Sequence, residues 1–523
     1  MRLEFFLAAN AVRFRAKTAL VTAQRRVSYG ELHECVNALA VGLKRLGVGV
    51  GDRVLVYLPN GLELVQTIYA GFALGAIVVP VNTRLTPREL AYFATDSRPR
   101  IFVHHAEALE ALAEVESEFA NVQRVIVGDA AAVARAPGAR RFDEVATPCD
   151  ETLPHVPPEA EDCLIIYSSG TTGKPKGAVI THANMVVQHG FINAVDWRIS
   201  SDDVYLVTTP LAHRTGMARM LNALCLGGTL VVMEHFSVET ALALIESERV
   251  SVLGMVPTIG RMLLPLLEKQ AARCASLRHV VVTGEAFPVE IKRRLIDLLP
   301  QVRLHSFFAM TEVGSVTSLE HEEQFTHPSS VGRVTPGLEV RLVDDRGREV
   351  SVGEAGELLV RAGVPGRFTT MRCYFERPEA TAAAIVDGWV HTGDMARFDV
   401  DGYLYIVDRK KDMVLSGGFN IYTKEVEQML HEHAAVFDVA VVGVPDSIFG
   451  EAVAAFIELK PGATLTVEQI QEHSKARIAS YKKPKHVFFV DALPRNPTGK
   501  VLKNELRTRA ARELKLILEG AVT

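Results

Sequence analysis

The chain has 523 residues, of which 48% are hydrophobic and 23% are charged, and its formal net charge is −5. A chain of this length exceeds what one hydrophobic core serves, so at least two domains are expected. The composition is typical of a soluble globular protein, and the weak negative charge argues against nucleic acid as the main partner.

The N-terminal part of the chain gives no sign of a membrane span or a leader. Residues 1–20 place charged side chains around a short apolar patch, which is typical of an amphipathic surface helix rather than a signal peptide. The uncharged run from Leu64 to Thr83 is interrupted by polar residues, glycines and Pro80, so it predicts a buried helix leading into a strand. The six scattered cysteines include no Cys-x-x-Cys pair, which favours reduced thiols over a disulfide framework or a zinc site. A cytoplasmic protein is therefore expected.

From Val27 to Val156, amphipathic helices alternate with short apolar strands. This alternation predicts α/β layering with largely parallel sheets. The helices are expected at Tyr29–Leu46 and Leu62–Phe72 and after a cap at Thr86, and the strands at Arg53–Tyr57, Ile101–Val103 and Val125–Val127.

The segment YSSGTTGKPKG, from Tyr167 to Gly177, is the most informative stretch. Apolar runs at Cys163–Ile166 and Ala178–Ile180 predict strands on both sides of it. Its glycines let backbone N–H groups approach an anion closely, its hydroxyls donate and its two lysines carry charge, so it is predicted to wrap phosphate groups. Pro175 directly follows the first lysine and disfavours a helix there, which excludes a Walker A loop. The order of the eleven residues disfavours a merely flexible polar turn.

The predicted secondary-structure pattern changes twice in the second half of the chain. Up to about Phe307 the α/β pattern continues, whereas short strands with Gly-rich turns from Gly332 to Tyr405 predict a β-rich subdomain or barrel. The tail after Lys411 returns to an α+β pattern. The remaining expected elements are a helix capped by Thr181, a helix at Thr423–Glu432, and strands at Thr229–Met233, His279–Val282, Gly337–Val343, Val439–Val444 and Ala452–Leu459.

The charge cluster Asp408–Asp412 lies between the β-rich region and the tail. A solvated turn is the commonest interpretation of such a run. Its position makes it the best candidate for a domain boundary.

Three shorter motifs each present one reactive side chain. FFAMTE ends in Glu312, a carboxylate suited to hold Mg²⁺ against nucleotide phosphates. WVHTGD ends in Asp394, which can accept from the two hydroxyls of a ribose, and PRNPTGK presents Lys500 on a stiff loop. Each motif alone is more often an exposed turn residue or a surface lysine. Their order and joint presence are informative.

With these residues in hand, the chain resembles the adenylate-forming superfamily, and within it the AMP-forming acyl- and aryl-CoA synthetases. The resemblance runs from about Arg25 to Leu514 and is carried by YSSGTTGKPKG, FAMTE, HTGD, DRKKD with SGGFNIY, and PRNPTGK. It implies a fold of class α/β, with a large N-terminal domain of two α/β subdomains plus a β-barrel over residues 1–408. A hinge at 409–411 and a small mobile α+β C-terminal domain at 412–523 would follow.

The resemblance also implies the reaction. A carboxylate attacks the α-phosphate of ATP to give acyl-AMP and pyrophosphate, and the thiol of CoA then displaces AMP. ATP, Mg²⁺ and coenzyme A are the expected cofactors and co-substrates, and a hydrophobic fatty or aryl acid is the expected substrate. A homodimer is a further expectation.

The same resemblance assigns the nucleotide contacts. The loop from Ser168 to Lys176 would hold the β- and γ-phosphates, Thr311 the α-phosphate, and Glu312 with Thr172 the Mg²⁺. Asp394, assisted by Arg409, would take the ribose hydroxyls. The full set of implied ATP- or AMP-binding residues is Ser168, Ser169, Gly170, Thr171, Thr172, Gly173, Lys174, Lys176, Gly284, Glu285, Ala286, Ser306, Phe307, Phe308, Ala309, Met310, Asp394 and Arg409.

The remaining roles belong to the acid, the acceptor and the moving domain. Lys500 would bridge the acid's carboxylate and the α-phosphate, and Lys411 would be the hinge. Gly417 and Gly418 would let the pantetheine arm of CoA pass the backbone, where a Cβ would obstruct it. His213 would gate the acyl pocket.

The chain departs from the family pattern near the acyl entrance. Phe308-Ala309 stand where Tyr-Gly is common, so an adenine-stacking ring is kept and one hydroxyl is lost. Phe307 and Ala309 add bulk there, and Ser169 replaces a commoner Thr. Arg214 is expected on the surface rather than at a polar group of the acid.

Three alternatives stay open at this point. One is an adenylation enzyme that loads a carrier-protein phosphopantetheine. A luciferase-type oxidoreductase ranks low because no residue identifies oxidative chemistry. A catalytically inactive nucleotide-binding protein is disfavoured because all four residues Glu312, Asp394, Arg409 and Lys500 are present.

Overall fold

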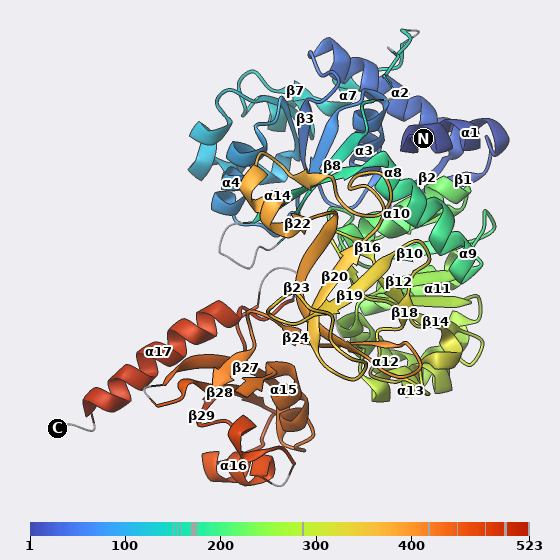
Figure 1. The fold of residues 1–523 in the computed structure, drawn as a ribbon. Coiled ribbons are helices and arrows are strands. Elements are labelled where there is room, and N and C mark those ends of the chain that lie inside the picture. Colours follow the sequence, from blue (N-terminus) through green and yellow to red (C-terminus); the bar gives the residue numbers. More distant parts are fainter. Residues whose placement is uncertain are drawn as a thin grey trace. The chain divides into compact units, whose positions relative to one another are not determined.

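The structure, a computed structural model, describes residues 1–149, 151–153, 155–157, 159–168, 175–284, 287–416, 419–446, 448–475, 477–495 and 499–520 (Figure 1). The chain divides into two compact units. The first contains residues 1–340 and 360–391, and the second contains residues 341–359 and 392–523. The domain boundary near Asp408 stays a prediction.

One sheet of the first unit has eight strands in the order β21-β9-β8-β4-β3-β5-β6-β7. Its pairings from β8 through β4, β3, β5 and β6 to β7 are parallel, and β9 pairs antiparallel with both β8 and β21. The strands are β3 (Arg53–Tyr57), β4 (Ile77–Pro80), β5 (Ile101–His105), β6 (Gln123–Val127), β7 (Arg140–Arg141), β8 (Asp162–Ser168), β9 (Lys176–Thr181) and β21 (Cys373–Tyr374).

The helices that accompany this sheet lie at the positions expected from the sequence, and the expected cap at Thr86 is present. The side chain of Thr86 accepts from the backbone N–H of Glu89 and the Glu89 carboxylate accepts in return, a capping box that starts the fourth helix. The first half of the uncharged run from Leu64 to Thr83 lies in a buried helix that leads into β4, as predicted. The helices are α1 (Leu3–Arg13), α2 (Tyr29–Arg45), α3 (Leu62–Ala73), α4 (Pro87–Ser97), α5 (Leu109–Leu112), α6 (Ala130–Val133) and α7 (Phe142–Val145).

The second sheet of this unit has seven strands in the order β14-β13-β12-β10-β11-β1-β2. All its pairings are parallel except that between β1 and β2. The strands are β1 (Thr18–Val21), β2 (Arg26–Ser28), β10 (Val204–Val207), β11 (Thr229–Val232), β12 (Val252–Met255), β13 (His279–Val282) and β14 (Arg303–Ser306), and the helices are α8 (His182–Met185), α9 (Asn193–Trp197), α10 (Arg214–Leu226), α11 (Val238–Ser247), α12 (Pro257–Gln270) and α13 (Val289–Leu298). The α/β layering expected from the sequence is confirmed.

The predicted β-rich segment consists of short strands. Its elements are β18 (Arg333–Val334), β19 (Glu339–Val343), β20 (Gly356–Arg361), α14 (Pro378–Ala384), β22 (Ile385–Val386), β23 (Trp389–Phe398) and the start of β24 (Leu404–Arg409). Three two-residue strands precede the segment, β15 (Ala309–Met310), β16 (Gly314–Ser315) and β17 (Thr317–Ser318). β23 and β24 pair antiparallel.

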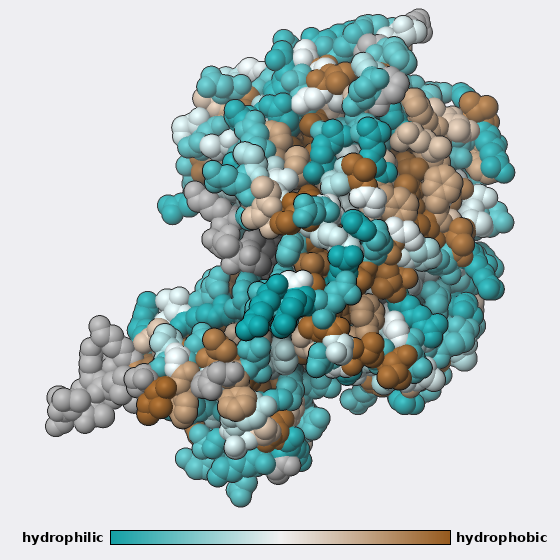
Figure 2. Space-filling view, viewed as in Figure 1, coloured by the Kyte–Doolittle hydropathy of each residue, from teal (hydrophilic) through white to brown (hydrophobic). Residues whose placement is uncertain are grey.

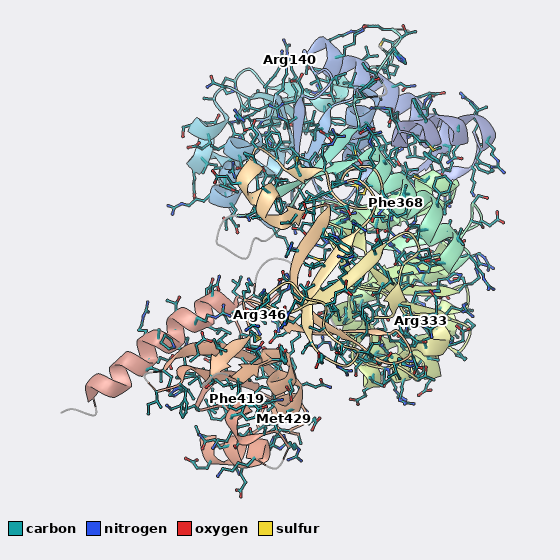
Figure 3. All side chains as sticks on the ribbon, viewed as in Figure 1. Arg140, Arg333, Arg346, Phe368, Phe419 and Met429 are labelled. Carbon is teal, nitrogen blue, oxygen red and sulfur yellow. The ribbon has the colours of Figure 1, made fainter. Side chains whose placement is uncertain are left out.

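The C-terminal part of the second unit has the predicted α+β pattern. β27 and β28 form a long antiparallel pair, and β29 pairs parallel with β28. Phe419, labelled in Figure 3, is exposed and stacks on Tyr481 with 4.5 Å between ring centroids. The elements are β25 (Val414–Ser416), β26 (Phe419–Ile421), α15 (Thr423–His431), β27 (Val436–Asp446), β28 (Gly450–Leu459), α16 (Val467–Lys475), β29 (His486–Val490) and α17 (Lys503–Gly520).

On the face seen in Figure 2, hydrophilic residues predominate and hydrophobic ones are interspersed among them. Among the helices of the described residues, none is long and apolar enough to cross a membrane.

The start of α10 lies very close to the turn that precedes it. Gly216 sits in its first turn, and a Cβ there would overlap the carbonyl oxygen of Pro210 and come within 3.0 Å of the Cα of Leu211. Only glycine therefore lets the helix begin against this turn, which ends at His213.

Replacing Gly216 with alanine is expected to lower the free energy of unfolding by about 1–3 kcal/mol, the usual cost of overpacking. The thermal midpoint reports the change. Gly190→Ala is the matched control, because a Cβ at Gly190 meets only ordinary contacts at 3.8 and 3.9 Å. Equal midpoints for the two variants would contradict the close approach.

Candidate active site

The predicted phosphate loop joins two antiparallel strands of the first unit. Ser168 at the end of β8 is the register partner of Lys176 at the start of β9. The hydroxyl of Tyr167 donates to the Asp96 carboxylate at 2.7 Å, and the hydroxyl of Tyr92 donates to the carbonyl of Pro175 at 2.7 Å. Both ends of the loop are thus tied to α4, and a strand follows the loop, unlike a Walker A helix. The loop residues Ser169, Gly170, Thr171, Thr172, Gly173 and Lys174 lie outside the described residues.

The FFAMTE motif runs from the end of β14 into a tight hairpin. β15 pairs with β16 so that Met310 faces Gly314, which places Thr311 and Glu312 in the turn between them. Gly314 has a φ of +86°, a conformation that glycine adopts readily. The carbonyl of Phe308 accepts from the backbone N–H of Val316 at 2.8 Å and fixes the base of the hairpin. The hairpin turn therefore presents the two site residues, Thr311 and Glu312.

The hairpin turn and the phosphate loop meet through one tyrosine. The hydroxyl of Tyr374 on β21 donates to a Glu312 carboxylate oxygen at 3.0 Å. The ammonium of Lys176 lies over the Tyr374 ring, 5.2 Å from its centroid, and β21 pairs with β9 beside it. The cation at the loop's end and the carboxylate of the turn therefore flank the same side chain.

This arrangement fits a phosphate-bound Mg²⁺. Mg²⁺ prefers one or two carboxylates together with phosphate oxygens rather than an all-protein cage. Glu312 supplies one such carboxylate, and over the described ranges no group of three or more metal-ligating His, Cys, Asp or Glu residues occurs. The ion would be held by Glu312 and by the phosphates of a nucleotide.

Arg214, the first residue of α10, is buried, so its predicted surface position is wrong. The residue is 8% exposed, and its guanidinium donates to the carbonyl of Thr311. Burial lowers the pKa of Arg214 to about 10, and the Glu312 carboxylate acts in the opposite direction. The guanidinium therefore stays charged at neutral pH beneath the hairpin turn.

His213 caps α10 at the same place. Its Nδ1 accepts from the backbone N–H of Thr215 at 3.3 Å, and part of the residue stays accessible to solvent. Desolvation by the surrounding protein lowers the pKa of His213, which favours the neutral ring.

The end of β14 is held by the neighbouring loop. The hydroxyl of Thr283 donates to the carbonyl of Phe307 at 3.1 Å, and Gly284 follows it with a φ of +102°. The hydroxyl of Ser306 donates to Gln324 at 3.1 Å. The predicted nucleotide residues Gly284, Ser306 and Phe307 are thus adjacent, whereas Glu285 and Ala286 lie outside the described residues.

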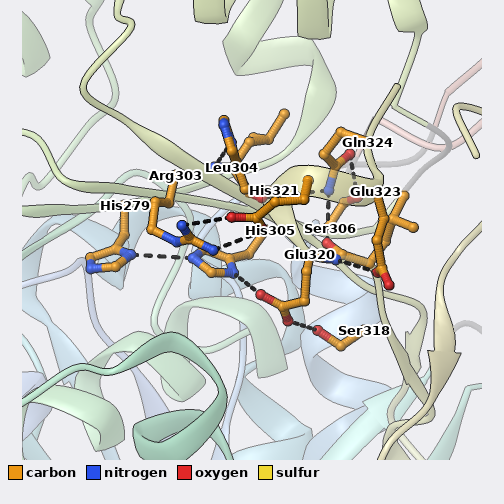
Figure 4. A network of polar contacts seen from close by, with 12 residues as sticks. His279, Arg303, Leu304, His305, Ser306, Ser318, Glu320, His321, Glu323 and Gln324 are labelled. Carbon is orange, nitrogen blue, oxygen red and sulfur yellow. Dashed lines mark hydrogen bonds and ion pairs between the residues drawn. The ribbon is translucent and has the colours of Figure 1, made fainter. Parts of the chain in front are cut away.

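A buried polar network that the sequence reasoning missed supports β14 (Figure 4). His279 and His305, on adjacent parallel strands, are joined by a contact of 3.2 Å between Nδ1 and Nε2. His305 Nδ1 contacts the Glu320 carboxylate at 3.2 Å, and Ser318 donates to the other oxygen at 2.9 Å. Parallel pairing of the two strands places both histidines on one face.

The predicted residues Asp394, Arg409, Lys411 and Lys500 lie in the second unit. Asp394 on β23 faces Arg409 on β24, and the Arg409 Nε lies 2.7 Å from an Asp394 oxygen. The pKa of Lys500 is lowered, first by desolvation of its ammonium and then by the charges of Arg409 and Lys411, while Asp394 opposes the shift. These four side chains therefore act on one another electrostatically. Gly417 and Gly418 lie outside the described residues.

A solvated turn, the commonest interpretation of the run Asp408–Asp412, does not describe its two ends. Asp408 is 1% exposed and accepts from the backbone N–H and the hydroxyl of Thr423. Asp412 is 9% exposed and pairs with Arg507 at 2.7 Å. The carboxylates fix the segment that carries Arg409 and Lys411.

Comparisons with known proteins agree with this geometry. The AMP-binding enzyme family model matches residues 7–375, and the model of the AMP-binding enzyme C-terminal domain matches residues 425–500. Feruloyl-CoA synthase of Amycolatopsis sp is 35% identical over 92% of this chain and 94% of its own length. The 3-[(3aS,4S,7aS)-7a-methyl-1,5-dioxo-octahydro-1H-inden-4-yl]propanoyl:CoA ligase of Rhodococcus jostii (strain RHA1) is 34% identical over 94% of this chain and 96% of its own length. ATP-bound MatB from Rhodopseudomonas palustris has a TM-score of 0.86 and 29% identity, covering 98% of this chain and 99% of that one.

The fold and the site define an adenylate-forming enzyme. The chain belongs to the AMP-binding enzyme family. It is an acid–thiol ligase that activates a carboxylic acid with ATP and Mg²⁺ to an acyl-AMP and transfers the acyl group to CoA.

The His279 network predicts a stability change with pH. Burial lowers the pKa of His279 to about 4, first through desolvation and then through the neighbouring His305. In the unfolded chain the ring binds a proton below about pH 6.5, so the folded state loses stability as the pH falls from about 6.5 to 4, by about 2 kcal/mol at pH 5. The thermal midpoint of His279→Asn should therefore fall less between pH 7 and pH 5 than that of the wild type. The exposed His235→Asn variant is the control, and identical pH slopes for wild type and His279→Asn would contradict the assignment.

Proposed function

We propose that this ligase activates a carboxylic acid with a hydrophobic body, fatty or aromatic, and that the residues named above perform the two half-reactions. The observation that carries the proposal is the meeting of Lys176 and Glu312 at Tyr374. A cation at the end of a phosphate loop and a carboxylate suited to Mg²⁺ then flank one place where a triphosphate can lie.

In the first half-reaction, a carboxylate oxygen forms a bond to the α-phosphorus of ATP. The bond from this phosphorus to the bridging oxygen breaks, and pyrophosphate leaves with that electron pair. Lys176 and the phosphate loop would stabilise the charge on the leaving pyrophosphate, and Thr311 would contact the α-phosphate. The ammonium of Lys500 would offset the repulsion between the carboxylate of the acid and the anionic α-phosphate. Asp394, held by Arg409, would orient the ribose.

In the second half-reaction, the thiol of CoA loses its proton to solvent and its sulfur bonds to the acyl carbon, and the acyl–oxygen bond breaks to release AMP. His213 would stand at the entrance to the acyl site, where its depressed pKa keeps the ring neutral beside an acyl-adenylate. Gly417 and Gly418 would line the path of the pantetheine arm. Lys411 would be the hinge by which the residues after 411 turn between the half-reactions, since Lys500 is needed only in the first.

The acid's hydrophobic body is proposed from the relatives and from the chain itself. The names of the two relatives given above specify a feruloyl group and a fused-ring propanoyl group. Apolar side chains of α10, such as Met217 and Met220, are fully buried in the first unit. A cytoplasmic location and a homodimer belong to the same proposal.

The substrate class is tested by measuring pyrophosphate release with a panel of fatty and aryl acids, with and without CoA. We expect acid-dependent pyrophosphate without CoA, limited by slow release of acyl-AMP, and repeated turnover with AMP formation when CoA is added. A carrier protein bearing phosphopantetheine is the alternative acceptor in the same assay. Turnover with the carrier protein and none with CoA would contradict the assignment of CoA as the acyl acceptor.

Lys500→Ala should reduce adenylation by roughly 10²–10³-fold, the usual effect of removing a preorganised electrostatic partner. Thioester formation from supplied acyl-AMP should be unchanged. Single-turnover assays of each half-reaction separate the two, and the exposed Lys460→Ala variant is the matched control. Equal losses in both half-reactions would contradict a role of Lys500 that is confined to adenylation.

A further inference from the structure

Arg219 is a buried cation whose charge no carboxylate of the described residues balances. It lies on α10 and is 3% exposed. Its Nε and Nη1 atoms are buried, and over the described part of the chain neither has a hydrogen-bond partner. Its guanidinium lies over the Trp197 ring, 4.7 Å from the centroid, a contact that satisfies no N–H donor along its edge.

Other unsatisfied donors lie near Arg219, since His189 and Tyr205 both interact with it electrostatically. Within the described residues, Arg214 Nη2 and His189 Nε2 are also buried without a hydrogen-bond partner, and so is the hydroxyl of Tyr205. The pKa of His189 is lowered well below its usual value by burial and by the two arginines, so the ring is neutral. Two positive charges therefore share this interior, where Glu312 balances only Arg214.

The backbone makes room for this cluster. Gly254 on β12 leaves space for the Arg219 stem, because a Cβ there would come within 2.7 Å of the arginine Cγ and Cδ. His189 belongs to a π-helix, Val186–Ile192, an element that is rare and frequent at functional sites.

The cluster adjoins the predicted acyl entrance. The Trp197 ring that contacts Arg219 lies 5.6 Å from the ring of Phe307, at the start of FFAMTE. Arg214, at the other end of the cluster, donates to the carbonyl of Thr311. Arg214 and Arg219 thus adjoin the FFAMTE segment, in which Thr311 would contact the α-phosphate.

A buried charge without a partner is costly, and an apolar side chain of similar size would pack there without that cost. A ligand that supplies oxygen acceptors removes the penalty when it binds. We propose that Arg219 binds an oxygen acceptor, a carboxylate or a ketone, carried by the acid at the end remote from its reacting carboxylate. This inference rests on the proposed function and narrows it to acids whose hydrophobic body carries a distal oxygen group.

The test compares acids that differ only at the distal end. Straight-chain acids of six, eight and ten carbons are assayed as the plain acid, the ω-carboxy acid and the (ω−1)-oxo acid, with 3-phenylpropanoate and 3-(4-carboxyphenyl)propanoate as an aromatic pair. The readout is kcat/KM for acid-dependent pyrophosphate release. We expect the best oxygenated acid to exceed its plain counterpart by about 10–100-fold, the usual worth of a charged hydrogen bond. Preference for the carboxy over the oxo acid distinguishes the two acceptor groups.

The variants Arg219→Met and Arg219→Lys separate binding from structure. Arg219→Met should reverse the preference toward the plain acid, while its thermal midpoint without acid stays equal to that of the wild type or rises, because a buried unpaired charge has been removed. Arg219→Lys should keep part of the preference. A lower midpoint with equal losses for every acid, or a wild type that does not prefer any oxygenated acid, would overturn the inference. Stabilisation by ATP with no pyrophosphate from any acid would instead refute the proposed function, and the inference with it.

Discussion

The site in the first unit depends on one contact, the hydrogen bond that the guanidinium of Arg214 donates to the carbonyl of Thr311. It joins the start of α10 to the hairpin turn of FFAMTE. The contact needs glycine at two places, since Gly216 lets α10 begin against the preceding turn and a Cβ at Gly314 would lie 3.2 Å from Arg214 Nη2. Once the turn is fixed, Glu312 reaches Tyr374, and Tyr374 reaches the lysine at the end of the phosphate loop.

Charge is distributed differently in the two units. In the first, two cations of α10, Arg214 and Arg219, are buried, and within the described residues each has side-chain N–H groups without a hydrogen-bond partner. In the second, the Asp394–Arg409 pair on β23 and β24 balances itself, and Lys500 experiences the positive field of its neighbours. A lysine raised in energy in this way gains most from an anionic reaction centre, which suits a residue that acts on an acid and a phosphate.

The local sequence pattern predicted the helices and strands. The predictions that failed concern residues whose position is set by tertiary packing. The strands around the phosphate loop, the caps at Thr86 and Thr181 and the buried helix α3 follow from short-range rules, and they are found as expected. Arg214 was misplaced because general statistics put arginine on the surface, whereas the helix that carries it is buried almost throughout. The network of His279, His305 and Glu320 was missed because its members are brought together only by the pairing of β13 with β14 and by the chain that returns beside it.

The central claim is that the acid's own carboxylate attacks the α-phosphorus of ATP. An acid labelled with ¹⁸O in its carboxylate tests this directly when the products of turnover with CoA are analysed by mass spectrometry. The account predicts AMP that carries one ¹⁸O atom from the acid and pyrophosphate that carries none. Labelled inorganic phosphate with ADP as the nucleotide product, or labelled pyrophosphate with unlabelled AMP, would contradict it.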